Sequence, residues 1–269
     1  MILSFNQVTK KYSALETAIQ NISFGIKEGE FTALAGPSGS GKSTLLNLAA
    51  GLDFPSSGEV TLLGRNLAML GKSAISDLRC NQVGFVFQSY NLFPVLTALE
   101  NVEYPLALKK IPSKTRRELA KRALKETGCG ELGGRLPSEL SGGQQQRVAI
   151  ARAIVATPQI VFADEPTANL DSKTAKLLLD VFKELNTQKG ITFLFSSHDP
   201  LVLQTAERII QVADGQIQGD TVRSFSSPFA PARPFAKPPS RYFQSGVGRI
   251  HQVVSDVSEA KTKWDLSTQ

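Results

Sequence analysis

The chain has 269 residues, which is long enough for a full-sized hydrophobic core in one or two domains. Its composition, with 41% hydrophobic and 20% charged residues, is typical of a globular protein, and no apolar run is long enough to cross a membrane. The net charge is +6, but residues 221–269 hold seven Lys or Arg against three Asp or Glu, which leaves the rest of the chain at only +2 and argues against an electrostatic face for nucleic acid.

The cysteines and the N-terminus exclude two other classes. Cys80 and Cys129 lie far apart and lack the spacing of metal ligands, so we expect two reduced thiols rather than a disulfide or a zinc site. Residues 1–6 contain no charged leader before an apolar segment, so we expect the protein to be made and kept in the cytoplasm.

The first thirty residues are predicted to form strands separated by turns. Residues 2–5 and 22–26 alternate between apolar and polar side chains, and residues 27–30 form a polar turn. Between the strands, Tyr12 follows two lysines and offers a ring on which an adenine base could stack. Taken alone, however, Tyr12 is better interpreted as an ordinary surface tyrosine.

A glycine-rich loop then stands between a predicted strand at 31–35 and a predicted helix at 45–50. Its glycines let successive backbone N–H groups point inward, and the helix adds the positive end of its dipole, so the loop suits a polyphosphate. We expect Lys42 to reach the β- and γ-phosphates and Ser43 to hold Mg²⁺, which predicts a nucleoside triphosphate. An ordinary Gly/Ser turn is the weaker interpretation because both flanking elements fit. The loop is Gly36-Pro37-Ser38-Gly39-Ser40-Gly41-Lys42-Ser43-Thr44.

A helical region interrupts the strands in the middle of the chain. Residues 83–87 are a predicted strand that ends at Gln88. Beyond it, helices are predicted over 96–110 and 119–127, the second opened by a possible capping box at 115–118. The charged residues of this insertion are interpreted as a solvated helix face rather than a binding patch.

Polar side chains follow the predicted elements of the second half. Ser141-Gly142-Gly143 opens a helix, whose N-terminus is a second potential anion site. The buried strand at 160–163 ends in Asp164-Glu165, and the apolar strand at 191–195 leads to His198.

The C-terminal segment, residues 221–269, differs from the rest in composition. It holds five of the chain's fourteen prolines, mixed with aromatic residues. Proline at this density prevents regular packing, so we expect at least residues 224–241 to be extended, disordered or docked on the domain.

Five motifs, in a fixed order, carry a resemblance to a known family. The segment Leu140-Ser141-Gly142-Gly143-Gln144-Gln145-Gln146-Arg147 precedes Asp164-Glu165, with the phosphate loop and Gln88 before it and His198 after it. Over about residues 1–220 this set resembles the ATP-binding subunit of an ATP-binding-cassette (ABC) transporter. The resemblance implies an α/β P-loop NTPase fold with a mixed sheet core, an N-terminal antiparallel β subdomain and an α-helical subdomain inserted at about 89–157. Residues 221–269 would form a basic, Pro-rich tail.

The resemblance also implies a homodimer of ATP-binding subunits. In this family two subunits meet head to tail, so Ser141, Gly142 and Gly143 would touch the γ-phosphate of the ATP held by the Lys42 of the other copy. Asp171, in the turn after the acidic pair, would belong to the loop that links the two sites.

Roles for the remaining motif residues follow from the same resemblance. Asp164 would support Mg²⁺ together with Ser43 and Gln88, Glu165 would polarise the attacking water, and His198 would orient that water beside the γ-phosphate. A solvated carboxylate is the alternative for Glu165, but adjacent carboxylates facing phosphates are costly without a cation. His198 standing alone would be read as a core or cap histidine.

The resemblance also favours Tyr12 as the aromatic residue that stacks on the adenine base. Finer similarity at residues 87–94, 96–102 and 163–172 points to lipoprotein-releasing and macrolide-export ATPases. It implies an integral membrane permease as partner, contacted by the segment from Gln88 to about 105, and a place on the inner face of the cell membrane. The long Pro-rich tail departs from short members of that group.

Two alternatives share some of these motifs. A regulatory ATPase of the cell-division type, which transmits force without moving a substrate, stays open. A soluble ABC ATPase for DNA repair or translation is disfavoured, because the sequence shows no long coiled-coil insertion, zinc module or tandem cassette.

Overall fold

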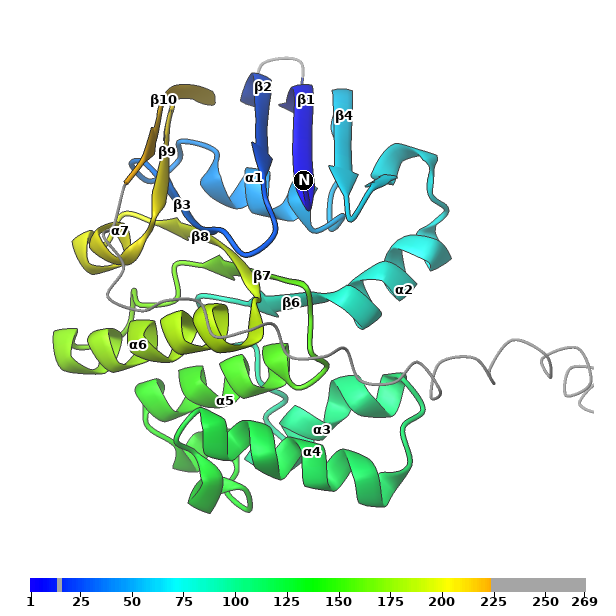
Figure 1. Cartoon of the computed structure of the whole chain (residues 1–269), viewed down its shortest axis with the longest axis vertical. Coiled ribbons are helices and arrows are strands. Elements are labelled where there is room, and N and C mark those ends of the chain that lie inside the picture. The colour runs from blue at the N-terminus through cyan, green and yellow to red at the C-terminus, as the bar shows by residue number, and fades with distance from the viewer. Residues whose placement is uncertain (14–15, 224–269) are drawn as a thin grey trace, which may run out of the picture. The chain divides into compact units, whose positions relative to one another are not determined.

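The computed structural model describes residues 1–13 and 16–223 (Figure 1). The predictions for the Pro-rich segment 224–269 lie outside the described residues. The last described strand, β10 (Gln216–Val222), continues two residues beyond the predicted end of the ATP-binding domain at 220.

An antiparallel sheet of four strands forms one layer of the molecule. Its strands run in the order β2-β1-β4-β5. Phe5 of β1 pairs with Phe24 of β2 in the strand register, and the two rings stack at a centroid distance of 4.7 Å. The bounds are β1 Leu3–Lys11, β2 Thr17–Ile26, β4 Ser57–Leu62 and β5 Arg65–Asn66.

A second sheet of six strands forms the core, in the order β10-β9-β3-β8-β7-β6. Strands β9, β3, β8, β7 and β6 are parallel, and β10 is antiparallel to β9, so this is a mixed sheet. The carboxyl ends of the parallel strands therefore meet at one edge, where ligands bind in sheets of this kind. The bounds are β3 Phe31–Ala35, β6 Val83–Val86, β7 Ile160–Asp164, β8 Thr192–Ser197 and β9 Arg208–Ala213.

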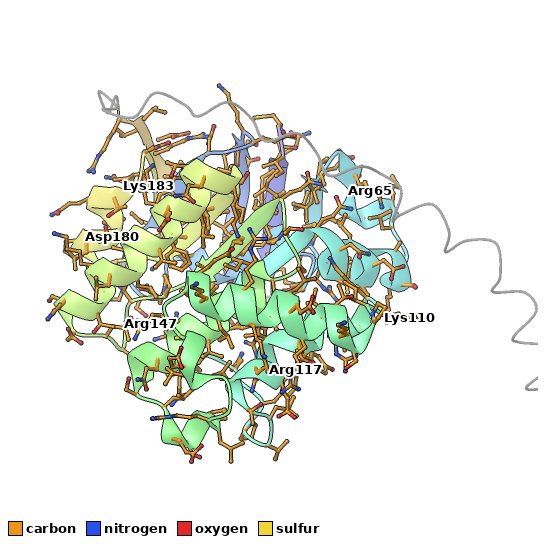
Figure 2. The ribbon with its side chains drawn as sticks, turned by 60° about the horizontal axis from the view of Figure 1, so that its bottom comes forward. Arg65, Lys110, Arg117, Arg147, Asp180 and Lys183 are labelled. Atoms are coloured by element: carbon orange, nitrogen blue, oxygen red, sulfur yellow. The ribbon has the colours of Figure 1, made fainter. Side chains whose placement is uncertain are left out.

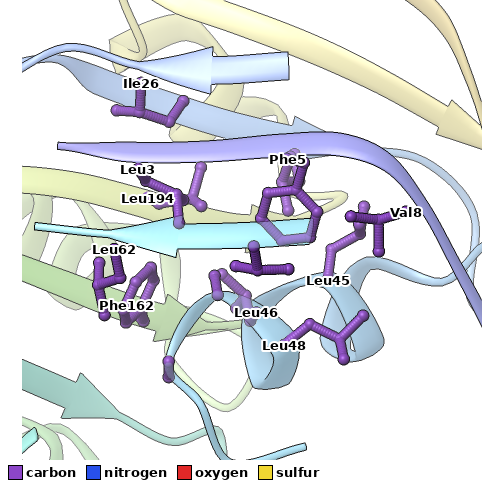
Figure 3. Packing of buried hydrophobic residues seen from close by; sticks show 14 of the residues in the cluster. Leu3, Phe5, Val8, Ile26, Leu45, Leu46, Leu48, Leu62, Phe162 and Leu194 are labelled. Atoms are coloured by element: carbon purple, nitrogen blue, oxygen red, sulfur yellow. The ribbon is translucent and has the colours of Figure 1, made fainter. Parts of the chain in front are cut away.

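Helix α1 (Lys42–Ala49) lies between the two sheets. Leu45 and Leu46 of α1 are fully buried against Phe5 of the antiparallel sheet and against Phe162 and Leu194 of the core sheet (Figure 3). Burying large apolar side chains on both sides of one helix is worth on the order of 1.5–3 kcal/mol for each side chain, so the helix is firmly held.

The opposite face of the core sheet packs on other helices. Phe182 of α6 (Ser172–Lys189) meets Phe193 and Phe195 of β8 at 5.3 Å each. Many charged side chains of the helices are exposed, among them Arg117 and Asp180 (Figure 2). The remaining helices of the core are α2 Lys72–Gln82 and α7 Pro200–Thr205.

Three helices form a separate cluster between β6 and β7. They are α3 (Ala98–Leu108), α4 (Ser113–Glu126) and α5 (Gly142–Ile154), and they share a core that includes Val102, Leu124 and Val148. The mixed sheet, the antiparallel sheet and these helices confirm the predicted fold class. Short 3₁₀ helices lie at Leu67–Met69, Gly130–Leu132 and Pro137–Glu139.

The predicted capping box at residues 115–118 is wrong. Helix α4 begins at Ser113, with Pro112 at the N-cap position and no side-chain cap. Proline can precede a helix without a lost donor, so the helix starts earlier than the Thr/Glu spacing suggested. A capping box does open α3, where Thr97 and Glu100 bond to each other's backbone N–H groups.

Helices α2 and α7 and strand β10 were not predicted. Both cysteines are free, as expected. In the part of the chain that the structure describes, no helix has the length and apolarity required to span a bilayer.

Candidate functional site

The phosphate loop connects β3 to α1 at the carboxyl edge of the core sheet. A Cβ on Gly36 would lie 2.0 Å from the carbonyl oxygen of Val212, so only glycine fits there. Gly41 has φ of +101°, and a Cβ on it would lie 2.8 Å from the Ala18 carbonyl oxygen. The loop can therefore pass close to its neighbours only because these two positions have no side chain.

Lys42 points back into this loop. Its side chain is buried, and Nζ donates to the carbonyl oxygens of Gly36 and Pro37, each at 2.8 Å. A buried ammonium is costly unless it has hydrogen-bond partners, and here two backbone oxygens supply them. The arrangement keeps a fixed positive charge inside a glycine-rich cradle, which suits an anionic ligand.

Ser43 and Asp164 meet across the same edge. The Ser43 hydroxyl donates to Oδ1 of Asp164 at 3.1 Å, although the residues are 121 positions apart. Among residues 1–13 and 16–223 there is no cluster of three or more His, Cys, Asp or Glu that could hold a metal alone. One hydroxyl and one carboxylate nevertheless fit Mg²⁺, which binds through few protein ligands and takes the rest from phosphates and water.

Glu165 and His198 form a pair after β7 and β8. Nδ1 of His198 lies 2.8 Å from Oε1 of Glu165, and the Ser197 hydroxyl donates to Oε2 at 3.2 Å. The Glu165 side chain is 13% exposed and the His198 side chain 69%. Glu165 also has φ of +43°, an unusual conformation for a residue with a side chain, and its N–H donates to the Ser196 carbonyl at 2.8 Å. The carboxylate is thus held in one orientation at the sheet edge.

A cleft of about 680 Å³ joins these features. Two buried hydroxyls near it, those of Ser40 and Ser196, have no hydrogen-bond partner among the described residues, so a ligand could supply one. The cleft brings together ten of the predicted site residues: Tyr12, Ser38, Gly39, Gly41, Lys42, Ser43, Thr44, Gln88, Glu165 and His198.

Sequence reasoning missed several residues that line the cleft. Glu16 and Thr17 come from the start of β2, and Asp214 and Gly215 come from the turn after β9. Nothing in the sequence showed that β9 pairs with β3 and so brings this turn to the edge of the sheet. The Gly215 N–H donates to the Ser40 carbonyl at 3.3 Å and fixes the turn beside the phosphate loop.

Eight other predicted residues do not line the cleft. Gly36, Pro37 and Ser40 belong to the phosphate loop itself, and Asp164 bonds to Ser43 beside the cleft, whereas the other four lie on other elements. Ser141 caps α5, accepting from the Gln144 N–H at 3.4 Å, and Gly142 and Gly143 form the first turn of this helix. Asp171 caps α6, and hydrogen bonds from the Thr174 hydroxyl and from backbone N–H groups lower its pKa. The structure therefore does not place the second anion site, Ser141 to Gly143, in the same cleft as Lys42.

The sequence model of the family described as ABC transporter matches residues 19–168. The chain belongs to this family. This chain is 45% identical over 224 residues to the uncharacterized ABC transporter ATP-binding protein MJ0796 of Methanocaldococcus jannaschii. The aligned region covers 81% of this chain and 95% of MJ0796. The chain is 42% identical over 225 residues to the macrolide export ATP-binding/permease protein MacB of Syntrophobacter fumaroxidans, covering 82% of this chain and 32% of MacB.

Solved structures of the family are also similar. A dimeric structure of a post-hydrolysis state of the ATP-binding cassette MJ0796, bound to ADP and Pi, has a TM-score of 0.78 at 42% identity and covers 83% of this chain and 100% of that chain. The structure of cbiO1 from Clostridium perfringens, part of the ABC transporter complex cbiONQ, has a TM-score of 0.75 at 31% identity and covers 81% and 87%. This chain is an ABC transporter ATP-binding subunit and an ATPase.

Proposed function

We propose that this ATPase powers a membrane permease for export, or for extraction of an envelope substrate such as a lipoprotein, a drug or a peptide. One observation carries the chemical part of the proposal. The ends of β3, β6, β7 and β8 bring a lysine, a glutamine, two carboxylates and a histidine to one edge of the sheet. Such a set can bind a triphosphate and direct a water molecule at its terminal phosphorus.

Each side chain has a role in this proposal. Lys42 binds the β- and γ-phosphates, where its charge offsets the charge that develops during transfer. Ser43, Asp164 and Gln88 would hold Mg²⁺, which supplies charge neutralisation on the phosphate oxygens when it is bound. Glu165 accepts a proton from the attacking water, and His198 orients that water and contacts the γ-phosphate.

The ATP site is completed by a second copy of the chain. Ser141, Gly142 and Gly143 stand at a helix N-terminus outside their own cleft, where an N–H group and the helix dipole favour an anion. The dimeric structure of MJ0796 supports a dimer of this chain. We infer that the two copies meet head to tail, so that this segment of one copy meets the ATP bound by the other. Asp171 would lie on the loop that links the two sites. ATP binding then closes the dimer, and hydrolysis opens it.

The inference that the partner is a membrane permease rests on the similarity to MacB proteins. Their name joins ATP-binding and permease functions, and this chain matches about a third of the MacB proteins of Syntrophobacter fumaroxidans and Marinobacter nauticus. We infer that the chain works on the cytoplasmic face of the cell membrane, with the segment from Gln88 to about 105 contacting an integral permease.

Affinity capture tests the transport role. A tagged Glu165→Gln variant is expected to stay closed on ATP and to copurify from native membranes with a permease that has a large envelope domain. The matched control is Lys42→Ala, which should not close and should recover much less of the same partner. A division-associated membrane protein in place of the permease would favour the regulatory alternative. Ribosomes or nucleic acid, with no membrane protein, would contradict the proposal.

A further inference from the structure

The ring of Tyr12 stands at the mouth of the cleft on a short connection. Tyr12 directly follows β1, which ends at Lys11, and it is 53% exposed. An exposed aromatic side chain on a loop is ordinarily free to change its orientation. Here two contacts restrain it, one from Asp53 and one from Lys10.

Asp53 holds the hydroxyl end of the ring. Its Oδ2 accepts from the Tyr12 hydroxyl at 3.1 Å, and its Oδ1 accepts from Nζ of Lys10 at 2.7 Å and from the Phe54 N–H at 2.7 Å. Burial by itself raises the pKa of the Asp53 carboxyl, but the hydrogen bonds from Lys10, Phe54 and Tyr12 together lower it below its ordinary value. Asp53 is therefore an ionised acceptor at neutral pH.

Lys10 restrains the face of the ring. Its Nζ lies over the Tyr12 ring at 4.9 Å from the centroid, and it also donates to the Phe54 carbonyl at 2.9 Å. The Lys10 side chain is only 13% exposed, so the ammonium stays in this position rather than in solvent. A cation over one face of a phenol ring is attracted by the ring electrons and occupies that face. The other face is the one left for a flat ligand.

Asp53 is fixed to the helix that begins at the phosphate loop. Helix α1 starts at Lys42 and ends at Ala49, and the N–H groups of Leu52 and Asp53 then donate to the Asn47 carbonyl at 2.9 and 3.3 Å. The helix is about 12 Å long. One rigid element thus carries the lysine of the phosphate loop at its first residue and the acceptor for Tyr12 just past its end.

We propose that Asp53 and Lys10 are positioning residues that hold Tyr12 as a one-sided platform for the nucleotide base, at a set distance from the phosphate loop. The inference rests on the proposed ATP site and on the expectation that Tyr12 stacks on the adenine base there. It adds that the Tyr12 ring is already held in its binding orientation before the nucleotide binds. Part of the entropy cost of ordering this side chain is therefore not incurred on binding.

A purely structural role for the contacts of Lys10 and Asp53 is the competing explanation. Other bonds already tie the end of β1 to the turn before β4, because the Ser56 N–H donates to the Thr9 carbonyl at 2.8 Å and the Lys11 N–H donates to the Ser56 hydroxyl at 3.0 Å. The contacts of Lys10 and Asp53 are thus not the only ones that hold the strand to this turn. They differ from the other bonds in that they act on the ring.

Equilibrium binding of MgADP and of magnesium pyrophosphate to the full chain tests the inference, because neither ligand is hydrolysed here and only ADP has a base. Tyr12→Ala should weaken ADP binding by about 5–100-fold, the usual range for losing one base–aromatic stack. Tyr12→Phe, Asp53→Asn and Lys10→Met should each weaken it by about 3–10-fold, in line with the loss of one hydrogen bond or cation contact. Pyrophosphate binding should change less than about 2-fold in every variant.

The matched control is Lys11→Met, which removes the neighbouring exposed lysine that has no side-chain hydrogen bond in the described structure. It should leave both affinities unchanged. Combining Tyr12→Phe with Asp53→Asn should cost less than the sum of the two single changes, because both act on the bond between Tyr12 and Asp53. Thermal unfolding shows whether each variant is folded. If Lys10→Met does not fold, the inference is tested by Tyr12→Phe, which removes only one oxygen atom.

The outcomes separate the two levels of the argument. If Tyr12→Ala leaves ADP binding unchanged, the role of Tyr12 is wrong and the positioning inference falls with it. If Tyr12→Ala weakens ADP binding but Tyr12→Phe, Asp53→Asn and Lys10→Met do not, Tyr12 keeps its role and the positioning inference alone is overturned. An equal loss for ADP and pyrophosphate would show that the contacts serve the fold of the loop, which also overturns the inference.

Discussion

The cleft at the edge of the core sheet and the N-terminus of α5 are the two proposed anion sites, and they differ in how many groups of the chain they bring together. The cleft gathers Lys42, Ser43, Glu165 and His198 from distant parts of one chain, with His198 paired to Glu165 and Ser43 bonded to the neighbouring Asp164. The turn at Gly142 is capped by Ser141 but does not line this cleft. Under the proposed function, this difference means that one chain supplies the binding and reacting groups, while the second anion site serves another copy of the chain.

The largest effect is expected from Lys42→Ala, which empties the cradle of its fixed charge. Charged hydrogen bonds contribute about 1.5–3 kcal/mol each, so ATP affinity should fall by roughly 100-fold or more. Isothermal titration of ATP into the full chain measures this. Lys110→Ala, an exposed lysine outside the cleft, is the control and should bind normally. Tight ATP binding by Lys42→Ala would contradict the assignment of this loop as the phosphate-binding part of the ATP site.

Glu165→Gln separates binding from chemistry within the cleft. The amide keeps the size of the side chain but cannot accept the proton of water, so turnover should fall by about 10²–10⁴-fold while ATP affinity stays within about 2-fold. Phosphate release under saturating ATP gives the rate. Glu59→Gln, an exposed glutamate on β4, should hydrolyse ATP at the normal rate. Normal turnover by Glu165→Gln would exclude it as the base.

Gly142→Asp tests the second anion site, at the N-terminus of α5, without changing the cleft. An aspartate at the first turn favours the helix through its dipole but repels a phosphate that approaches from another copy, so turnover should fall by about 10–100-fold with ADP binding unchanged. A Cβ at this position would lie 2.9 Å from the Tyr90 hydroxyl, so Gly142→Ala is measured beside it to isolate the effect of charge. If Gly142→Asp turns over ATP as fast as Gly142→Ala, the second anion site has no part in hydrolysis.

The smallest effect is expected far from both regions, at Asp220 on β10. Two hydrogen bonds from Arg208, at 2.8 and 2.6 Å, lower the pKa of this carboxyl. A carboxyl whose pKa is lower in the folded than in the unfolded state stabilises the fold at pH values above the unfolded-state pKa. This stabilisation is lost as the pH falls through the folded-state pKa. The side chain is 39% exposed, so screening limits the loss in unfolding free energy for Asp220→Asn to about 0.5–1 kcal/mol at pH 7.

Urea unfolding of Asp220→Asn and of the unchanged chain at pH 7 and near pH 3 measures that difference, which should shrink at the lower pH. ATP binding and turnover should be unaffected. A pH-independent difference would mean that the ion pair is not its source.

Local patterns predicted the phosphate loop and the buried strands around it. The loop spans nine consecutive residues, and β3, β6 and β7 are short apolar runs that a buried parallel strand requires. Strand β10 was missed because it is a mostly exposed edge strand with no apolar run. The role of each predicted site residue stays a prediction until the variants are measured.

Contacts between distant residues could not be predicted in the same way. Tyr12 and Asp53 are 41 positions apart, and their bond depends on how β1 meets the end of α1. Thr17 and Asp214 reach the cleft only because of the order of strands in the two sheets. Such pairings are set by tertiary packing, and a single sequence contains no local signal for them.

The mass of the Glu165→Gln chain in solution tests the central claim, that the second anion site serves another copy. Light scattering should give the mass of two chains with MgATP and of one chain with MgADP. Adding Gly142→Asp should return the mass of one chain in MgATP, although ATP remains bound. A single-chain mass at saturating MgATP, or a dimer that persists with Gly142→Asp, would contradict the account.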